Sequence, residues 1–208
     1  MEQMKKVVIA GLFLLGSTGA VLAATGTTTF TVSATVPAPS SVSISAASVN
    51  SSTNVFTPVS GTSLSFDPLV FDTTNNIYVP DHYFAINVGP TAGGGSTSVN
   101  LAYTEGSNPN SVIGGQGLGW KSVATFTKQL SGTETKLTAH GTGGKKLLKD
   151  VTAESITSTE LGAGTFRMYL GVETNPTAPG EPAGAQVISG ADKPGTYTGS
   201  LVVSGTVL

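Results

Sequence analysis

Near its N-terminus the chain reads Thr27-Thr-Thr-Phe-Thr-Val-Ser-Ala-Thr-Val36. Apolar side chains at Phe30, Val32, Ala34 and Val36 alternate strictly with threonine and serine in this stretch. A period of two residues is typical of a β-strand that buries one face. The stretch therefore predicts an all-β protein whose first strand must pair with another strand edge.

A second amphipathic strand is expected at the other end of the chain, from Tyr197 to Leu208. Its apolar face carries Tyr197, Leu201, Val203 and Val207, and Gly199 and Gly205 interrupt that face. A chain that begins and ends with such strands is suited to edge pairing, either within one molecule or between neighbours.

The first residues have the features of a secretory signal peptide. Lys5 and Lys6 precede an apolar run, 7–15, and Val21 and Ala23 occupy the two small positions before a cleavage point. We expect residues 1–23 to be removed and the mature protein to be exported. The run is too short for a membrane span and no second one follows, so no span is expected in the mature chain.

Composition argues against several classes of function. The formal net charge is −2, which is far from the basic balance of a nucleic-acid binder. Cysteine is absent, which rules out disulfides, a thiol nucleophile and the usual structural zinc sites. We expect no cofactor, no metal and no nucleic-acid partner.

The rest of the chain reads as short strands separated by turns. Turn signals such as Asn75-Asn76 and Gly143-Gly144 recur, and a short helix is considered only at Lys145–Ser155. This pattern predicts a Greek-key β-sandwich over residues 40–208, preceded by an extension at 24–39. The expected strands are Ser41–Ala46, Ser63–Phe71, Tyr83–Val88, Ser98–Tyr103, Lys121–Lys128, Thr165–Glu173, Gln186–Ile188 and Thr196–Leu208.

No catalytic constellation emerges from the residue pattern. His140 lies in a turn-like setting and is expected to be exposed, and Asp81 and His82 are expected to point to opposite faces of a strand. The chain lacks a Gly-x-Ser-x-Gly elbow, so an enzyme is not expected, although a triad assembled in space stays open. Trp120, the only tryptophan, is interpreted as a core anchor or, alternatively, as a sugar-stacking residue.

Pro37 and Pro39 separate the first strand from the rest and would form a stiff, extended link. Projected away from the body, the strand could add to a groove of another subunit, where its alternate side chains fill pockets. Folded back, it would instead be the first strand of its own sandwich.

The stretches 26–36 and 194–208 resemble the secreted pilins of the spore coat protein U type, which are subunits of archaic chaperone–usher pili. In such subunits an immunoglobulin-like sandwich lacks one strand. A periplasmic chaperone first supplies a strand in its place, and the N-terminal extension of the next subunit then replaces the chaperone's strand. The resemblance includes a glycine fourteen residues from the end, here Gly195. The usual penultimate aromatic residue is replaced by Val207, and the usual cysteine pair is missing.

The resemblance implies a structural subunit of a cell-surface fibre, polymerised by donor-strand complementation. Donor side chains would be Phe30, Val32, Ala34 and Val36, and the acceptor groove would be bordered by Gly195, Tyr197, Leu201, Val203 and Val207. Implied partners are like subunits, a periplasmic chaperone and an outer-membrane usher, with export through the periplasm. The alternative is a secreted binding module that holds a carbohydrate or a host surface with Trp120 and the glycine-rich loops.

Overall fold

The structure is a computed structural model that describes residues 41–90, 97–110 and 116–207, all within one compact unit, 37–208. Every strand pair in these ranges is antiparallel, which confirms the all-β prediction. The signal peptide and the four donor residues (Phe30, Val32, Ala34 and Val36) lie outside the described residues.

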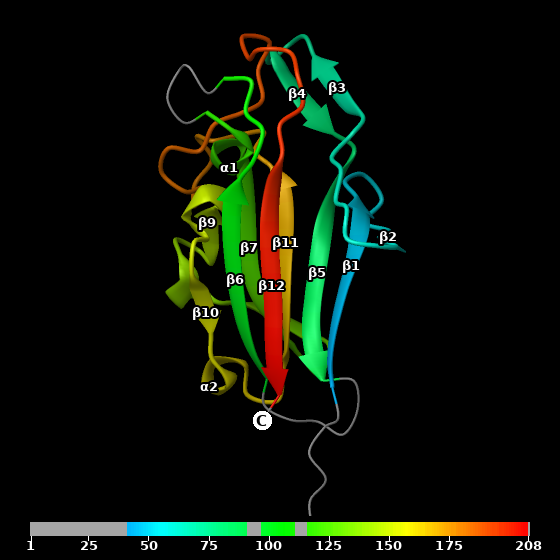
Figure 1. Cartoon of the computed structure of the whole chain (residues 1–208), viewed down its shortest axis with the longest axis vertical. Helices are drawn as coiled ribbons and strands as arrows, with labels where there is room; N and C mark the ends of the chain where they lie inside the picture. Colours follow the sequence, from blue (N-terminus) through cyan, green and yellow to red (C-terminus); the bar gives the residue numbers. More distant parts are fainter. Residues whose placement is uncertain (1–40, 91–96, 111–115, 208) are drawn as a thin grey trace, which may run out of the picture. The chain divides into compact units, whose positions relative to one another are not determined.

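Seven strands form the larger sheet (Figure 1). The path across it is β2 (Phe56–Pro58), β1 (Val42–Asn50), β5 (His82–Pro90), β11 (Thr165–Val172), β7 (Ser122–Leu130) and β8 (Thr133–Lys136), and β9 (Lys145–Leu147) also pairs with β7. In the centre, Met168 lies opposite Ile86 on one side and Phe126 on the other. These cross-strand partners lie on the same face of the sheet, so the apolar residues of neighbouring strands together form one continuous apolar face.

A smaller sheet consists of β10 (Glu154–Ile156), β6 (Thr97–Glu105) and β12 (Gly199–Val207), in that order. The hairpin of β3 (Leu69–Asp72) and β4 (Ile77–Pro80) forms a separate two-stranded sheet. Helical structure is limited to single turns: α1 (Leu118–Lys121), η2 (Thr138–His140), η3 (Leu148–Asp150) and α2 (Ser158–Leu161).

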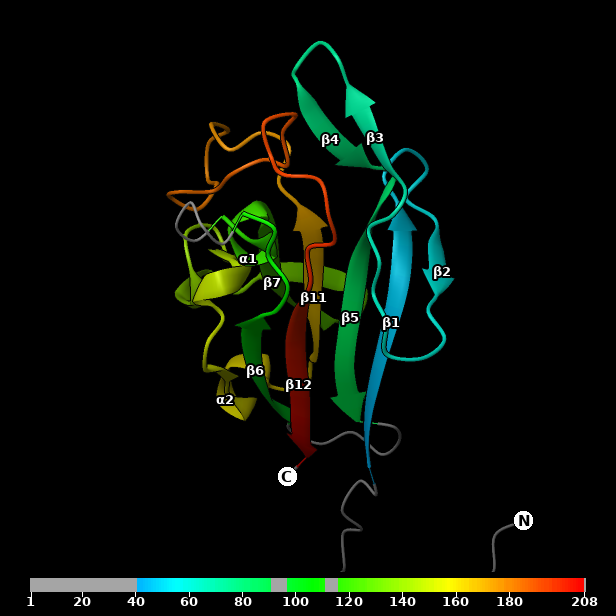
Figure 2. The same cartoon turned by 45° about the horizontal axis from the view of Figure 1, so that its top comes forward.

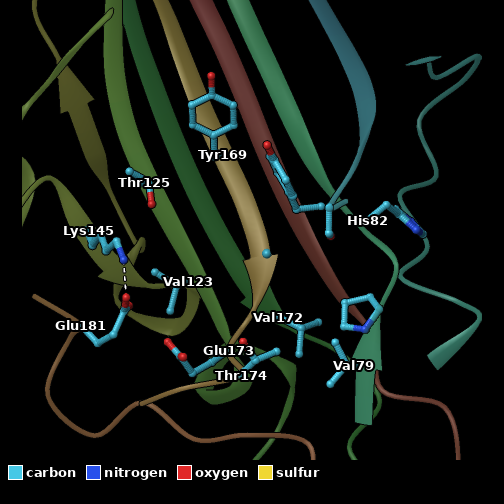
Figure 3. Close-up of a pocket in the computed structure, with 14 residues that line it drawn as sticks. Val79, His82, Val123, Thr125, Lys145, Tyr169, Val172, Glu173, Thr174 and Glu181 are labelled. Carbon is cyan, nitrogen blue, oxygen red and sulfur yellow. Dashed lines mark hydrogen bonds and ion pairs between the residues drawn. The ribbon is translucent and has the colours of Figure 1, made fainter. Parts of the chain in front are cut away.

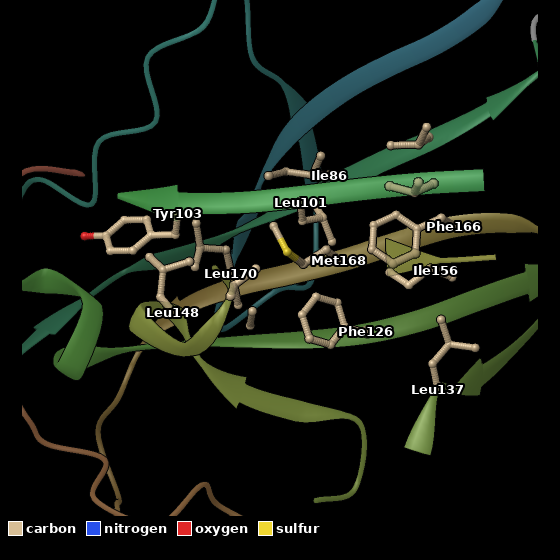
Figure 4. Close-up of a cluster of buried hydrophobic side chains, with 14 of the residues drawn as sticks. Ile86, Leu101, Tyr103, Phe126, Leu137, Leu148, Ile156, Phe166, Met168 and Leu170 are labelled. Carbon is tan, nitrogen blue, oxygen red and sulfur yellow. The ribbon is translucent and has the colours of Figure 1, made fainter. Parts of the chain in front are cut away.

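The core lies between the inner faces of the two sheets (Figure 4). The larger sheet contributes Phe84, Ile86, Val88, Phe126, Phe166, Met168 and Leu170, and β6 contributes Val99, Leu101 and Tyr103. Leu148 of η3, Ile156 of β10 and Leu161 of α2 cover one side of this core. Two sheets packed face to face bury one side chain in two from each strand.

Three sequence expectations differ from the structure. Lys145–Ser155 holds β9, the single turn η3 and the start of β10 in place of a helix. Pairing with β7 buries Leu147, and the turn of η3 buries Val151, whose carbonyl accepts from the Tyr103 N–H. Gln186–Ile188 forms no strand, and only its neighbour Ser189 makes an isolated bridge, to Ile77. In the expected strand Ser63–Phe71, regular pairing starts only at Leu69.

The core predicts a contrast between two phenylalanines. Phe126 is 0% exposed between the sheets, whereas Phe56 on β2 is 44% exposed. We expect Phe126→Ala to lower the free energy of unfolding by about 3–5 kcal/mol, because it removes apolar contacts and leaves a cavity. Phe56→Ala should cost less than about 1 kcal/mol, and equal losses in urea denaturation would contradict this description of the core.

Candidate functional site

The free edge of β12 is the first component of the site. All nine residues of β12 pair with β6, from Gly199 opposite Glu105 to Val207 opposite Thr97. Among the residues that the structure describes, no strand pairs with the other edge of β12. An unpaired edge presents backbone N–H and C=O groups that can accept another strand.

The second component is the start of β1. On one side β1 pairs with β5 along its whole length, but on the other it pairs with β2 only at Ala47–Val49. The Val59 N–H also donates to the Ala46 carbonyl at 2.9 Å, so within the described ranges the stretch Val42–Ser45 has a free edge too. Figures 1 and 2 show that β1 and β12 run in opposite directions.

Core-facing side chains of both strands remain partly uncovered. On β12, Leu201 and Val203 lie opposite the buried residues Tyr103 and Leu101, yet they are only half-buried. On β1, Ile44 lies opposite the buried Val88 and is nevertheless 47% exposed. We call this region the open margin, defined by Val42, Ile44 and Ala46 of β1 and by Leu201, Val203 and Val207 of β12.

The open margin is narrow at one end and wide at the other. A methyl group on Gly205 would lie 2.7 Å from Cγ1 of both Val42 and Val88, so the two strands touch there. Toward Gly199 they diverge (Figure 1), and a cavity of about 760 Å³ opens between segments 62–67 and 194–199. Leu64 and Phe66 form the apolar part of the first segment and pack against the core.

The structure brings the sequence-predicted acceptor residues to this one region. Gly195 and Tyr197 line the cavity, and Leu201, Val203 and Val207 follow along the open margin. Gly195 has φ +147°, and a Cβ there would lie 2.7 Å from Pro109 Cγ, so the position requires glycine. The Tyr197 hydroxyl donates a hydrogen bond to the Lys193 carbonyl at 2.8 Å.

Sequence reasoning missed Ile44, Leu64 and Phe66. The alternation of Val42, Ile44 and Ala46 did predict a strand, but it cannot show that a core-facing residue lacks cover. Leu64 and Phe66 were expected within a regular strand, whereas they belong to an unpaired segment at the rim of the cavity.

A buried ion pair fixes the wall of the cavity that precedes β12. Lys121 Nζ donates to Asp192 Oδ2 at 2.9 Å and to the Val187 carbonyl at 2.8 Å. Asp192 also accepts from Asn110 Nδ2 at 2.6 Å and from the Ser189 N–H at 2.7 Å. Burial opposes ionisation of Asp192, but these hydrogen bonds outweigh it and lower the pKa of the carboxyl.

Both histidine expectations are wrong. His82 Nδ1 contacts Asp81 Oδ1 at 2.5 Å, because Asp81 lies in the bend between β4 and β5 where strand alternation does not apply. His140 is buried, because η2 folds it against Glu154 and Glu160 and under the Phe126 ring. The described residues include no group of three or more His, Asp or Glu side chains placed to hold a metal ion.

A second, smaller cavity of about 370 Å³ lies on the outer face of the larger sheet (Figure 3). Its polar groups are the Lys145–Glu181 ion pair and Glu173, and its walls include Tyr83 and Tyr169. Burial, together with the neighbouring Glu181 carboxylate, raises the pKa of Glu173. Lys145 and Glu181 thus satisfy each other across this cavity.

Trp120 lies in α1, half-buried, and does not form part of a strand. Lys149 Nζ sits 4.2 Å from the centre of its ring, and Gly184 approaches it from the long loop after β11. Its contacts are those of a packing residue, and they do not favour the carbohydrate-binding alternative.

No family model, curated protein or solved structure matches this chain. No helix in the described part of the chain is long and apolar enough to cross a membrane. The site is therefore interpreted from its own geometry.

The Lys121–Asp192 pair predicts an acid-sensitive contribution to stability. Because the pKa of Asp192 is lower in the folded state, this contribution is present above the unfolded value, about 4, and is lost as the pH falls through the folded value. We expect Asp192→Asn to cost about 3 kcal/mol at pH 7, because it removes the charge that pairs with buried Lys121. In urea denaturation the variant and the wild type should begin to converge below pH 4 and coincide once the pH is below the folded pKa of Asp192. As a control, Asp150→Asn, in an exposed pair, should leave the profile unchanged, and an Asp192→Asn profile parallel to the wild type would exclude this role.

Proposed function

We propose that this protein is a pilin-like structural subunit of a cell-surface fibre, which polymerises by donor-strand complementation. The observation that carries the proposal is the open margin: apolar side chains face the core from β1 and β12 with only partial cover, beside two free backbone edges. An immunoglobulin-like sandwich that lacks one strand is the finer fold that goes with it. Export through the periplasm, a chaperone and an usher belong to the same proposal.

The run from Phe30 to Val36 has the chemistry that the open margin requires. Its apolar residues recur every second position, which matches the spacing of core-facing positions along β12. Burial of four such side chains contributes on the order of several kcal/mol. Backbone hydrogen bonds along β12 would add to this and fix the register.

Strand direction decides between pairing within one molecule and pairing between molecules. Since β1 and β12 run in opposite directions, an inserted strand is antiparallel to one of them and parallel to the other. β12 offers a free edge of nine residues, whereas that of β1 is limited to Val42–Ser45. Every described strand pair is antiparallel, and antiparallel pairing is slightly more stable per residue than parallel pairing. We therefore expect the donor to make its antiparallel pairing along the longer free edge, which is that of β12.

A donor from the same chain cannot take that direction. It would end with Val36 at the wide end, while Val42 lies at the narrow end beside Gly205. Residues 37–41 span at most about 20 Å, which is also the length of an extended run from Phe30 to Val36. The link would have to cover that length and reverse direction twice, and each reversal takes about four residues. A donor antiparallel to β12 therefore comes from a second subunit, and β1 and β12 must separate at Gly205 to admit it.

The first test places a charge in the open margin. Ile44→Asp should abolish fibre formation at little cost to folding, because Ile44 is already 47% exposed but would be covered by the donor. Its matched control is Val202→Asp on the opposite face of β12, where Val202 is 60% exposed. Assembly is read from heat-sensitive ladders on unboiled gels and from size exclusion. Normal ladders from Ile44→Asp would refute the acceptor role of this margin.

The second test separates the two kinds of pairing by mixing. Val32→Asp disables the donor and leaves the margin intact, whereas Ile44→Asp does the reverse. Each variant alone should remain monomeric, and their mixture should give heterodimers with one of each chain, because only one donor–acceptor pair is possible. If the strand completes its own sandwich, both variants stay destabilised monomers and mixing produces nothing.

A further inference from the structure

His82 holds the segment that forms one wall of the cavity at the wide end of the open margin. Its Nε2 lies 2.8 Å from the Ser65 carbonyl and its Nδ1 lies 2.5 Å from Asp81 Oδ1. The imidazole side chain is only 14% exposed, and its ring stacks on Phe66 and meets Phe84 edge-on. The ring thus joins the start of β5 to segment 62–67 by a polar contact and an aromatic one.

Both ring nitrogens of His82 face groups that only accept hydrogen bonds. A backbone carbonyl has no proton to donate, and neither has an ionised carboxylate. A neutral imidazole carries one N–H, so it satisfies one acceptor and turns a lone pair toward the other. Only the imidazolium can donate to both acceptors at once.

We propose that His82 is a pH-dependent latch on the acceptor site, whose protonated ring fixes Ser65 and Phe66 in place and so prepares the open margin for the donor strand. This inference rests on the proposed function, since it concerns the regulation of that site. Histidine side chains in general gain and lose a proton between about pH 5 and 8, so the latch closes toward the acidic end of that range.

The effect on binding follows from the position of the wall. Leu64 and Phe66 pack on the core beside the open margin, and Phe66 lies 5.2 Å from the Phe84 ring, centre to centre. When the ring becomes neutral, its single N–H goes to the charged Asp81 carboxylate, which is the stronger acceptor, and the hydrogen bond to the Ser65 carbonyl is lost. The ring then holds the wall by apolar contacts alone. A donor strand must then order the wall as it binds, which weakens its binding.

Few other charges surround His82. Asp67, on the held segment, accepts from the Ser65 hydroxyl and not from the ring. On its other side His82 borders the outer cavity with Lys145, Glu173 and Glu181, where Lys145 pairs with Glu181. Within the described ranges, Asp81 and Ser65 are the polar partners of the ring.

Asp81 offers a variant that separates the latch from simple loss of the histidine. In Asp81→Asn the side-chain amide can donate to Nδ1, and a neutral ring protonated at Nε2 still donates to the Ser65 carbonyl. The wall would then stay latched at both ends of the pH range. His82→Gln removes titration altogether.

The test uses the full chain with Val32→Asp, whose own donor run is disabled, and a capped peptide of sequence Thr27–Val36, which contains no ionisable side chain. We expect the peptide Kd to be about five- to tenfold higher at pH 8.0 than at pH 5.5. When Asp81→Asn or His82→Gln is combined with Val32→Asp, the ratio of the Kd at pH 8.0 to the Kd at pH 5.5 should fall below about twofold. Combining Asp150→Asn with Val32→Asp should leave the ratio unchanged. Amide exchange of residues 64–67, corrected for intrinsic rates, should be faster at pH 8.0 than at pH 5.5 in the Val32→Asp protein. The two rates should be equal when Asp81→Asn or His82→Gln is added.

The outcomes distinguish the latch from the proposed function. If the peptide binds equally at both pH values, or if His82→Gln keeps the ratio, the latch is refuted and the acceptor role stands. If the peptide binds at neither pH, the acceptor role fails, and the pH dependence of the His82 contact is then tested by amide exchange alone. A pH-dependent exchange of residues 64–67 that His82→Gln abolishes would then support it, and a pH-independent exchange would refute it.

Discussion

The structure depends on the way its two sheets meet along the side of β1 and β12. On another side of the core, Leu148 of η3, Ile156 of β10 and Leu161 of α2 cover it. In the described part of the chain no strand pairs with the free edges of β1 and β12, and core-facing Ile44 and Val203 are left partly in water. Uncovered apolar side chains and free backbone edges are both unfavourable, and one added strand would relieve both at once.

Sequence alone predicted the strands whose alternation is undisturbed. Phe166, Met168 and Leu170 of β11 and the alternating residues of β12 lie where a period of two places them. The same rule failed at Lys145–Ser155, where pairing with β7 and burial of Leu147 override local helical preference. It also failed for Asp81 and His82, because adjacent side chains point apart only inside a strand and Asp81 lies in a bend.

The candidate site was predictable on the β12 side and not on the β1 side. The alternation of Leu201, Val203 and Val207 predicts a strand, and the resemblance that includes Gly195 implies their place at the acceptor groove. Ile44 has an equally regular pattern, but whether a strand has a neighbour is a property of topology that periodicity does not contain. Leu64 and Phe66 belong to a segment whose position is set by His82 and Phe84, contacts that are distant in sequence.

The taper of the open margin bears on how long an assembled fibre would last. The strands diverge at Gly199 and touch at Gly205, so a donor can start at the wide end and must force Val42 away from Gly205 to finish. Withdrawal would meet the same obstacle in reverse, after a full ladder of hydrogen bonds had formed. The lifetime of each junction would then be set by an activation barrier and not by the equilibrium constant, so fibres could persist at subunit concentrations far too low to form them.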